Sequence, residues 1–189
     1  MAFNIYMVRN KKQYYRIITS SFIHGSYAHL FFNMFSFYSF AKHMELAYSP
    51  YVIGICFFLS TIGGSIFSLI KNRKNPKYTA IGASGGVCGI IYASIFLMES
   101  GNIYLMFIPF PISDKVYAVG FLIVSYVLMK RNKDNIGHDA HIGGAMTGVV
   151  YAIITIPLII KYEYKLLLAM CLPLAGIYLF DRFVWKYMR

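Results

Sequence analysis

Residues 80–98 read AIGASGGVCGIIYASIFLM, an apolar run that carries Ser84 near its start, within Gly82-Ala83-Ser84-Gly85. The run is close to the roughly 20 residues that a helix needs to cross the hydrocarbon core of a bilayer. A second apolar run, Ala140–Ile160, carries His141 just inside its start. Because ionisable groups are costly in hydrocarbon, a histidine at membrane depth indicates a functional site. We therefore consider Ser84 and His141 a candidate nucleophile and base.

The composition of the chain predicts its environment. Apolar residues make up 58% of the sequence and charged residues 13%, and the mean hydropathy is +0.57. A soluble globule of this size would have too little polar surface at that composition, so we expect an integral membrane protein. The connections between apolar runs are short. We predict an all-α, polytopic helical bundle that forms a single membrane domain over residues 1–189.

Six apolar runs predict about six membrane-spanning helices. They are Ala28–Leu46, Tyr51–Ile70, Ala80–Met98, Val116–Met129, Ala140–Ile160 and Leu166–Phe183. The run Ile103–Ile112 is also apolar but contains Pro109 and Pro111, which interrupt a helix. We interpret it as an interfacial or re-entrant connection rather than a further crossing.

The basic residues are divided unequally between the two ends of these predicted spans. One end has Arg9, Lys11, Lys12, Arg16, Lys71, Arg73, Lys74, Lys77, Lys130, Arg131, Lys133, Arg182, Lys186 and Arg189, and the other has Lys42, Lys115, Lys161 and Lys165. Membrane orientation explains the net charge of +11 better than nucleic-acid binding does, since the charges flank the spans. Ser84 and His141 lie near the more basic end, which the positive-inside rule places in the cytoplasm.

The polar residues in the spans predict acyl-transfer chemistry. A serine hydroxyl needs a base to accept its proton, and the oxyanion formed by its attack needs aligned donors. His29 and Asn33 are four residues apart, so they share one face of the Ala28–Leu46 helix and supply candidate donors. The backbone N–H of Ser84, at a helix N-terminus, supplies another. Glycines around Ser84 and after His141, including Gly144-x3-Gly148, would let the two helices approach closely.

The order of these residues resembles that of the rhomboid intramembrane serine proteases. Residues 15–24, YRIITSSFIH, are similar to the segment that leads into the second helix of that family, and the pattern His24-x4-His29-x3-Asn33 follows. Residues 82–85 resemble the nucleophile motif of the family, and Ala140-His141-x2-Gly144-x3-Gly148 resembles the helix that carries the base. The resemblance covers about residues 15–160 and leaves Leu166–Phe183 as an extra C-terminal span.

The resemblance implies that Ser84 and His141 form a catalytic dyad that cleaves transmembrane protein substrates within the bilayer. It implies that His29 and Asn33 stabilise the oxyanion, and that no acidic third residue, metal or cofactor takes part. The expected partners are transmembrane substrates and the lipid bilayer, not nucleic acid. The expected location is multi-pass, in a bacterial cytoplasmic membrane.

The sequence departs from the family pattern in three respects. Only about a dozen mixed residues precede Tyr15-Arg16, so the first core helix of the family is expected to be missing. Cys88 stands one turn after Ser84, where many members have a tyrosine that stacks on the base. Bacterial members usually open their site toward the extracytoplasmic face, against the distribution of basic residues described above; of the two orientations we favour that of the family.

Other functions agree less well with the sequence. A catalytically inactive rhomboid-like protein that binds transmembrane helices is the main alternative, although such relatives usually lack the serine or the histidine. A membrane zinc hydrolase could use His24, His29, His138 and His141, but the sequence contains no H-E-x-x-H. We expect His24 to be structural or a donor near the site, and His138 and Asp139 to be solvated at the membrane edge.

Overall fold

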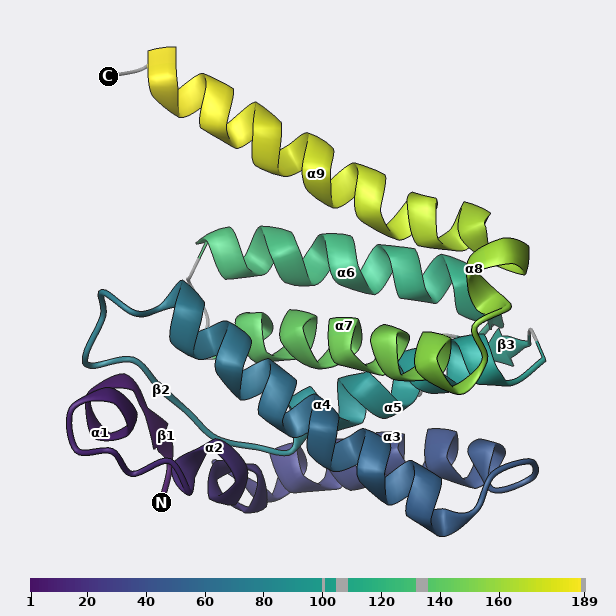
Figure 1. The fold of residues 1–189 in the computed structure, drawn as a ribbon, viewed down its shortest axis with the longest axis horizontal. Coiled ribbons are helices and arrows are strands. Elements are labelled where there is room, and N and C mark those ends of the chain that lie inside the picture. Colours follow the sequence, from purple (N-terminus) through teal and green to yellow (C-terminus); the bar gives the residue numbers. More distant parts are fainter. Residues whose placement is uncertain (100, 105–108, 132–135, 188–189) are drawn as a thin grey trace.

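The computed structural model describes residues 1–99, 101–104, 109–131 and 136–187. Within these residues the fold is a bundle of long helices with short strands and turns at its ends (Figure 1). The long helices are α3 (Tyr27–Met44), α4 (Pro50–Lys71), α5 (Ser84–Leu97), α6 (Asp114–Arg131), α7 (His138–Thr155) and α9 (Tyr164–Tyr187). The prediction of an all-α fold is therefore confirmed.

The shorter elements lie before α3 and between the long helices. They are β1 (Phe3–Asn4), α1 (Ile5–Arg9), α2 (Arg16–Thr19), the 3₁₀ helix η1 (Ser20–Phe22), β2 (Thr79–Ala80), β3 (Asn102–Ile103), β4 (Ile112–Ser113) and α8 (Ile159–Tyr162). The strands β3 and β4 pair antiparallel and close the ends of the connection predicted to be interfacial or re-entrant. Residues 105–108 of that connection are outside the described residues.

Each predicted span corresponds to a long helix. Fewer of these helices than expected, however, have the length and the apolar composition of a membrane crossing. Among the described residues, only α4 is both long and apolar enough to be a clear candidate span. The helix α5 has 14 residues, which is shorter than a usual crossing. The helix α3 contains His29, Asn33 and Lys42, which lower its hydropathy. The count of six spans thus stays a prediction.

Two predicted helix ends were wrong for local reasons. The helix α5 begins at Ser84 rather than at Ala80, because Thr79 and Ala80 pair with β1 and Gly82 has a φ of +110°, a backbone conformation that favours glycine. The helix α7 ends at Thr155 rather than at Ile160. Pro157 follows two residues later, and the residue before a proline disfavours helical geometry.

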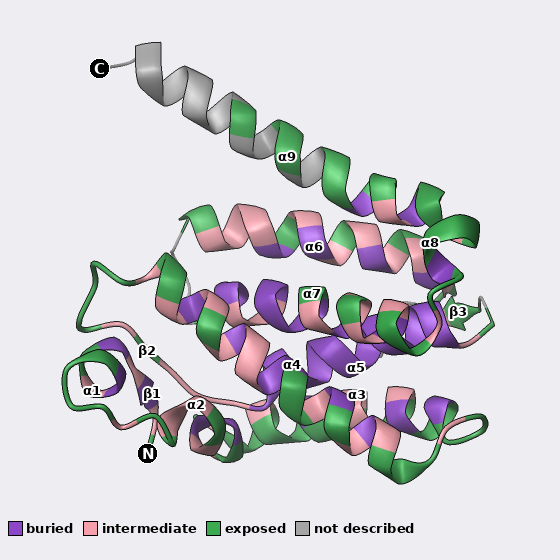
Figure 2. Cartoon of the chain, in the orientation of Figure 1, coloured by how far each residue is buried: buried purple, intermediate pink, exposed green. Residues whose placement is uncertain are grey.

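The helix α5 forms the centre of the bundle. Every residue of α5 after Ser84 is buried, which Figure 2 shows as a continuous purple helix between α3 and α7. Glycines set the closest approach between α5 and α7. A Cβ built on Gly144 would overlap the carbonyl oxygen of Gly85, and one built on Gly148 would overlap that of Gly89. The predicted close contact of the Ser84 and His141 helices through small residues is therefore confirmed.

The residues before α3 fold against the segment that leads to Ser84. Phe3 pairs with Ala80 and Asn4 with Thr79, and Phe3, Ile5 and Val8 form a small second core. Arg16 Nη1 donates to the carbonyl of Ala2 at 2.7 Å. These contacts fix the approach of the chain to α5, so the N-terminal segment helps to position Ser84.

Candidate active site

Ser84 is the first residue of α5, and the turn before it is held by two contacts. The N–H of Gly82 donates to the carbonyl of Ser20 at 3.0 Å, and the N–H of Ala83 donates to Nε2 of His24 at 3.4 Å. The N–H groups of the first helical turn have no partner within their own helix. Ser84 therefore combines a hydroxyl with backbone donors that point out of the helix end.

His29 and Asn33 both lie against Gly82, two residues before Ser84. Ser26 caps α3, since its hydroxyl accepts from the N–H of His29 at 3.1 Å. A Cβ built on Gly82 would lie 2.7 Å from Nε2 of His29 and 3.7 Å from Nδ2 of Asn33. The structure thus brings both predicted oxyanion donors beside the turn that carries the candidate nucleophile. Any side chain at position 82 would displace the His29 ring.

The amide of Asn33 is a buried donor that the described residues leave unsatisfied. Asn33 is 6% exposed, and its Nδ2 atom has no hydrogen-bond partner within the described parts of the chain. Most buried polar groups in folded proteins are paired, so such an atom requires an explanation. A donor that is held ready for a charge that develops only during a reaction meets that requirement.

His141 lies in the first turn of α7, where this helix crosses α5. The carbonyl oxygen of Ala140 would be 3.3 Å from a Cβ on Gly85, so the residues adjacent to His141 and Ser84 are in contact. The His141 ring contacts two further rings, with centroids 6.0 Å from Phe121 and 5.6 Å from His138. The structure brings the two helices together next to Ser84 and His141; the role of His141 as the base for Ser84 stays a prediction.

A small cavity lies beside Ser84. Its volume is about 30 Å³, and its lining includes Ser84 and hydroxyl groups from η1 and α4, namely those of Ser20, Ser21, Thr61, Ser65 and Ser68. The hydroxyl of Thr61 is buried and has no hydrogen-bond partner within the described residues. A cavity of this volume is large enough for one water molecule, which would satisfy that hydroxyl.

Sequence reasoning was wrong about His138 and Asp139, which it placed in solvent. Both are buried, at 7% and 4% exposure. The Asp139 carboxylate accepts hydrogen bonds from the Tyr78 hydroxyl at 2.6 Å, from the side chain of Asn72, and from the N–H of Ala140 at 3.0 Å. Burial, and then the adjacent Asp139, raise the pKa of Tyr78, so that Tyr78 stays a donor. Tyr78 and Asn72 come from the α4–α5 connection, which helical periodicity alone does not place beside α7.

The four histidines that were considered as zinc ligands form two separate pairs. His24 and His29 have ring centroids 5.1 Å apart, and His138 packs on His141. Among residues 1–99, 101–104, 109–131 and 136–187, no three potential metal ligands gather at one point. The structure gives the zinc hypothesis no support in this part of the chain.

His24 has a structural role that depends on its protonation. Burial, and then the neighbouring His29, lower its pKa below the ordinary value of 6.5. A folded-state pKa below the unfolded one means that the stabilisation is present above about pH 6.5 and is lost as the pH falls through the lower, folded value. The reason is that protonated Nε2 cannot accept from Ala83. We expect the melting temperature to fall on acidification, and to fall less for His24→Gln, which accepts without titrating. Equal pH profiles would contradict this role.

Comparison with known proteins assigns the family. The family model described as Rhomboid domain matches residues 11–158. Similar curated proteins include RHOMBOID-like protein 12, mitochondrial, of Arabidopsis thaliana, 28% identical over 71% of this chain and 44% of that protein. Rhomboid protein 1, mitochondrial, of Saccharomyces cerevisiae is 28% identical over 71% of the chain and 40% of its own length. Inactive RHOMBOID-like protein 8 of Arabidopsis thaliana is 31% identical over 57% of this chain and 32% of that protein.

The chain spans less than half the length of these three relatives. No solved structure matches it. The three relatives are plant and yeast proteins, so they give no support to the predicted bacterial membrane. The family is one of membrane proteins, as the composition predicted. With the domain match over residues 11–158 and the motifs in the expected order, the chain belongs to the rhomboid family.

Proposed function

We propose that this protein is an intramembrane serine protease that cleaves transmembrane protein substrates. The main observation in support is the convergence at one helix end of Ser84, the turn at Gly82 and two side-chain donors from α3. Gly82 lies within van der Waals reach of His29 and Asn33, and the unsatisfied Asn33 amide is buried there. A helix-packing role alone does not account for a buried donor without a partner.

In the proposed reaction, Ser84 Oγ attacks the scissile carbonyl carbon while His141 accepts the hydroxyl proton. The negative charge moves to the carbonyl oxygen, where Asn33, His29 and the Ser84 N–H donate hydrogen bonds. The tetrahedral intermediate then collapses and breaks the peptide C–N bond. His141 returns the proton to the leaving amine, so an acyl-enzyme and a free amine result.

The cavity beside Ser84 offers a place for the water molecule that the second half of the reaction consumes. A water molecule bound by the Thr61 hydroxyl in this cavity would lie close to the Ser84 ester. His141 accepts a proton from this water as it attacks the ester carbonyl, and the proton then passes to Ser84 Oγ as the C–O bond breaks. Hydrolysis needs water, and the hydrocarbon core of a bilayer contains none, so the protein itself would have to hold the water molecule.

Asn33→Ala is expected to lower kcat on the order of 10²-fold while KM changes little, because the lost hydrogen bond forms mainly in the transition state. The measurement is cleavage of a fluorescent transmembrane substrate in liposomes at several substrate concentrations. Asn75→Ala is a suitable control, since Asn75 lies exposed in the α4–α5 connection. A rise in KM with unchanged kcat would instead assign Asn33 to substrate binding.

A non-catalytic role is the second candidate, because one of the relatives is named inactive. Such a protein would bind transmembrane helices without cutting them. The discriminating experiment pairs cleavage with covalent labelling by a fluorophosphonate, which reacts with activated serines. Labelling and cleavage that both require Ser84 support the protease. Photo-crosslinking of a transmembrane helix without either activity supports the binding protein.

A further inference from the structure

The base of the proposed dyad is held by an aromatic ring from an unexpected helix. The chain has Cys88 in α5, at the position where many members of the family have a tyrosine that stacks on the base. In the structure, the ring in contact with His141 belongs to Phe121, about two turns after the start of α6. The two rings are 6.0 Å apart between centroids and are inclined by 31°, so that they lie in contact in a tilted arrangement.

Phe121 has little freedom to move, because it belongs to a group of packed aromatic residues. Tyr117 stacks on it with centroids 5.8 Å apart and an angle of 30°, and Tyr92 of α5 lies 6.3 Å away. Tyr92 is fully buried, and its hydroxyl donates to the carbonyl of Ala118 at 2.5 Å. That bond ties α5 to α6 beside Phe121. The position of the Phe121 ring is therefore determined jointly by the two helices.

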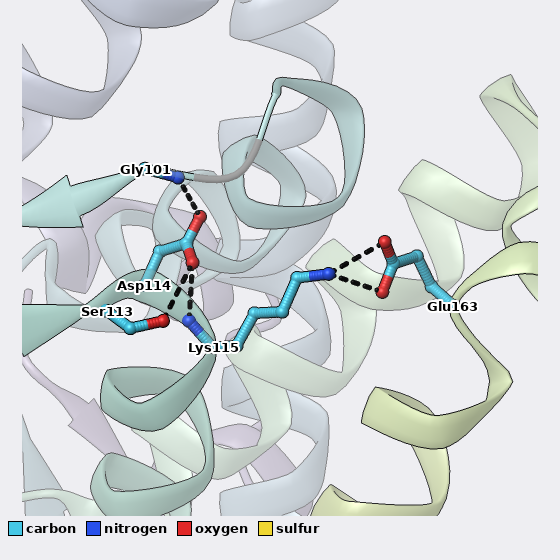
Figure 3. Close-up of polar contacts among 5 residues, drawn as sticks. All are labelled: Gly101, Ser113, Asp114, Lys115 and Glu163. Carbon is cyan, nitrogen blue, oxygen red and sulfur yellow. Dashed lines mark hydrogen bonds and ion pairs between the residues drawn. The ribbon is translucent and has the colours of Figure 1, made fainter.

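The beginning of α6 is fixed independently by charged groups (Figure 3). The Asp114 carboxylate accepts from the N–H of Gly101 at 2.8 Å and from that of Lys115 at 2.7 Å. Lys115 Nζ donates to both carboxylate oxygens of Glu163, before α9, at 2.8 Å. Phe121 follows less than two turns after Lys115, so these contacts limit the rotation and sliding of α6 that would carry the ring away from His141.

We infer that Phe121 is the positioning residue for the His141 base, in place of an aromatic side chain at position 88. The inference rests on the proposed protease function. The imidazole contacts the rings of Phe121 and His138, which are inclined to it by 31° and 84°. Two rings in different orientations restrict both torsion angles of His141. A base held in this way has few orientations available to it, which favours proton transfer from a nucleophile that is also fixed.

The test compares Phe121→Leu, which keeps apolar volume but removes the ring, with Phe121→Tyr, which keeps the ring. Phe40→Leu is the matched control, because Phe40 is another partly buried phenylalanine on the same core, in α3. Each reconstituted protein is assayed for the rate of fluorophosphonate labelling of Ser84, for kcat and KM with a transmembrane substrate, and for melting temperature.

We expect Phe121→Leu to lower both the labelling rate and kcat on the order of tenfold with KM nearly unchanged, and Phe121→Tyr to retain most of both. Phe40→Leu should change the melting temperature by a similar amount but leave the labelling rate of the folded protein unchanged. Labelling of Phe121→Leu at the wild-type rate, or an equal loss in Phe40→Leu, would overturn the positioning role. A wild-type protein that neither labels nor cleaves would contradict the proposed function itself.

Discussion

Ser84→Ala is expected to abolish cleavage of a transmembrane substrate by the reconstituted chain, with a loss on the order of 10⁴-fold or more. His141→Ala is expected to have a similar effect. The physical reason is that the nucleophile and its base act as one unit, since the hydroxyl is unreactive until its proton can leave. For the same reason the double variant should be no slower than either single variant. Initial rates in liposomes, corrected for folded protein, provide the measurement.

Ser94→Ala is the matched control for this experiment. Ser94 is also a buried serine of α5, but its hydroxyl donates to the carbonyl of Ile91 at 2.8 Å within the helix. The Ser94→Ala variant should therefore cleave the substrate near the wild-type rate. Undiminished cleavage by Ser84→Ala would remove Ser84 from the mechanism, and cleavage that is lost equally in Ser94→Ala would show that the assay measures helix packing.

Gly144→Ala is expected to destabilise the bundle by about 2–3 kcal/mol, which is large for the addition of one methyl group. A Cβ at this position would overlap the carbonyl oxygen of Gly85 in α5. Backbone cannot move aside as the end of a flexible side chain can, so α5 and α7 must separate. Because Gly85 follows Ser84 and Gly144 follows His141 by three residues, the separation should also reduce activity in the protein that remains folded.

Gly120→Ala tests whether this effect belongs to the helix crossing. A Cβ at Gly120, in α6, would meet no atom within 4 Å among the described residues. Alanine is also favoured over glycine in a helix by about 1 kcal/mol. Gly120→Ala should therefore leave the melting temperature unchanged or raise it. Equal melting temperatures for the two variants would contradict the close α5–α7 contact.

The sequence by itself was sufficient for the features that depend on composition and local spacing. Long apolar runs predicted the long helices, because helix formation follows from the order of residues along one segment. His29 and Asn33, four residues apart, share a helix face for the same reason. The glycines around Ser84 and after His141 predicted a close crossing, since few other arrangements require small residues in both helices.

The helix ends required information from outside each helix. Ala80 is apolar enough to extend α5, but it pairs with Phe3, more than 70 residues earlier in the chain. Hydrophobicity measures only the preference of a residue for an apolar environment. It does not distinguish a helical turn from a short strand at the end of a bundle.

Only the tertiary structure decided how the candidate site is supported. Asp139 is charged and adjacent to a connection, so sequence reasoning placed it in solvent, yet Tyr78 and Asn72 provide hydrogen bonds that permit its burial. Likewise, the family pattern would place a ring beside His141 from position 88 of α5, whereas the ring in contact with His141 is that of Phe121 in α6. In both cases the partner comes from another helix or connection. The sequence names the groups that carry the proposed chemistry, while the packing of separate helices determines which groups surround them.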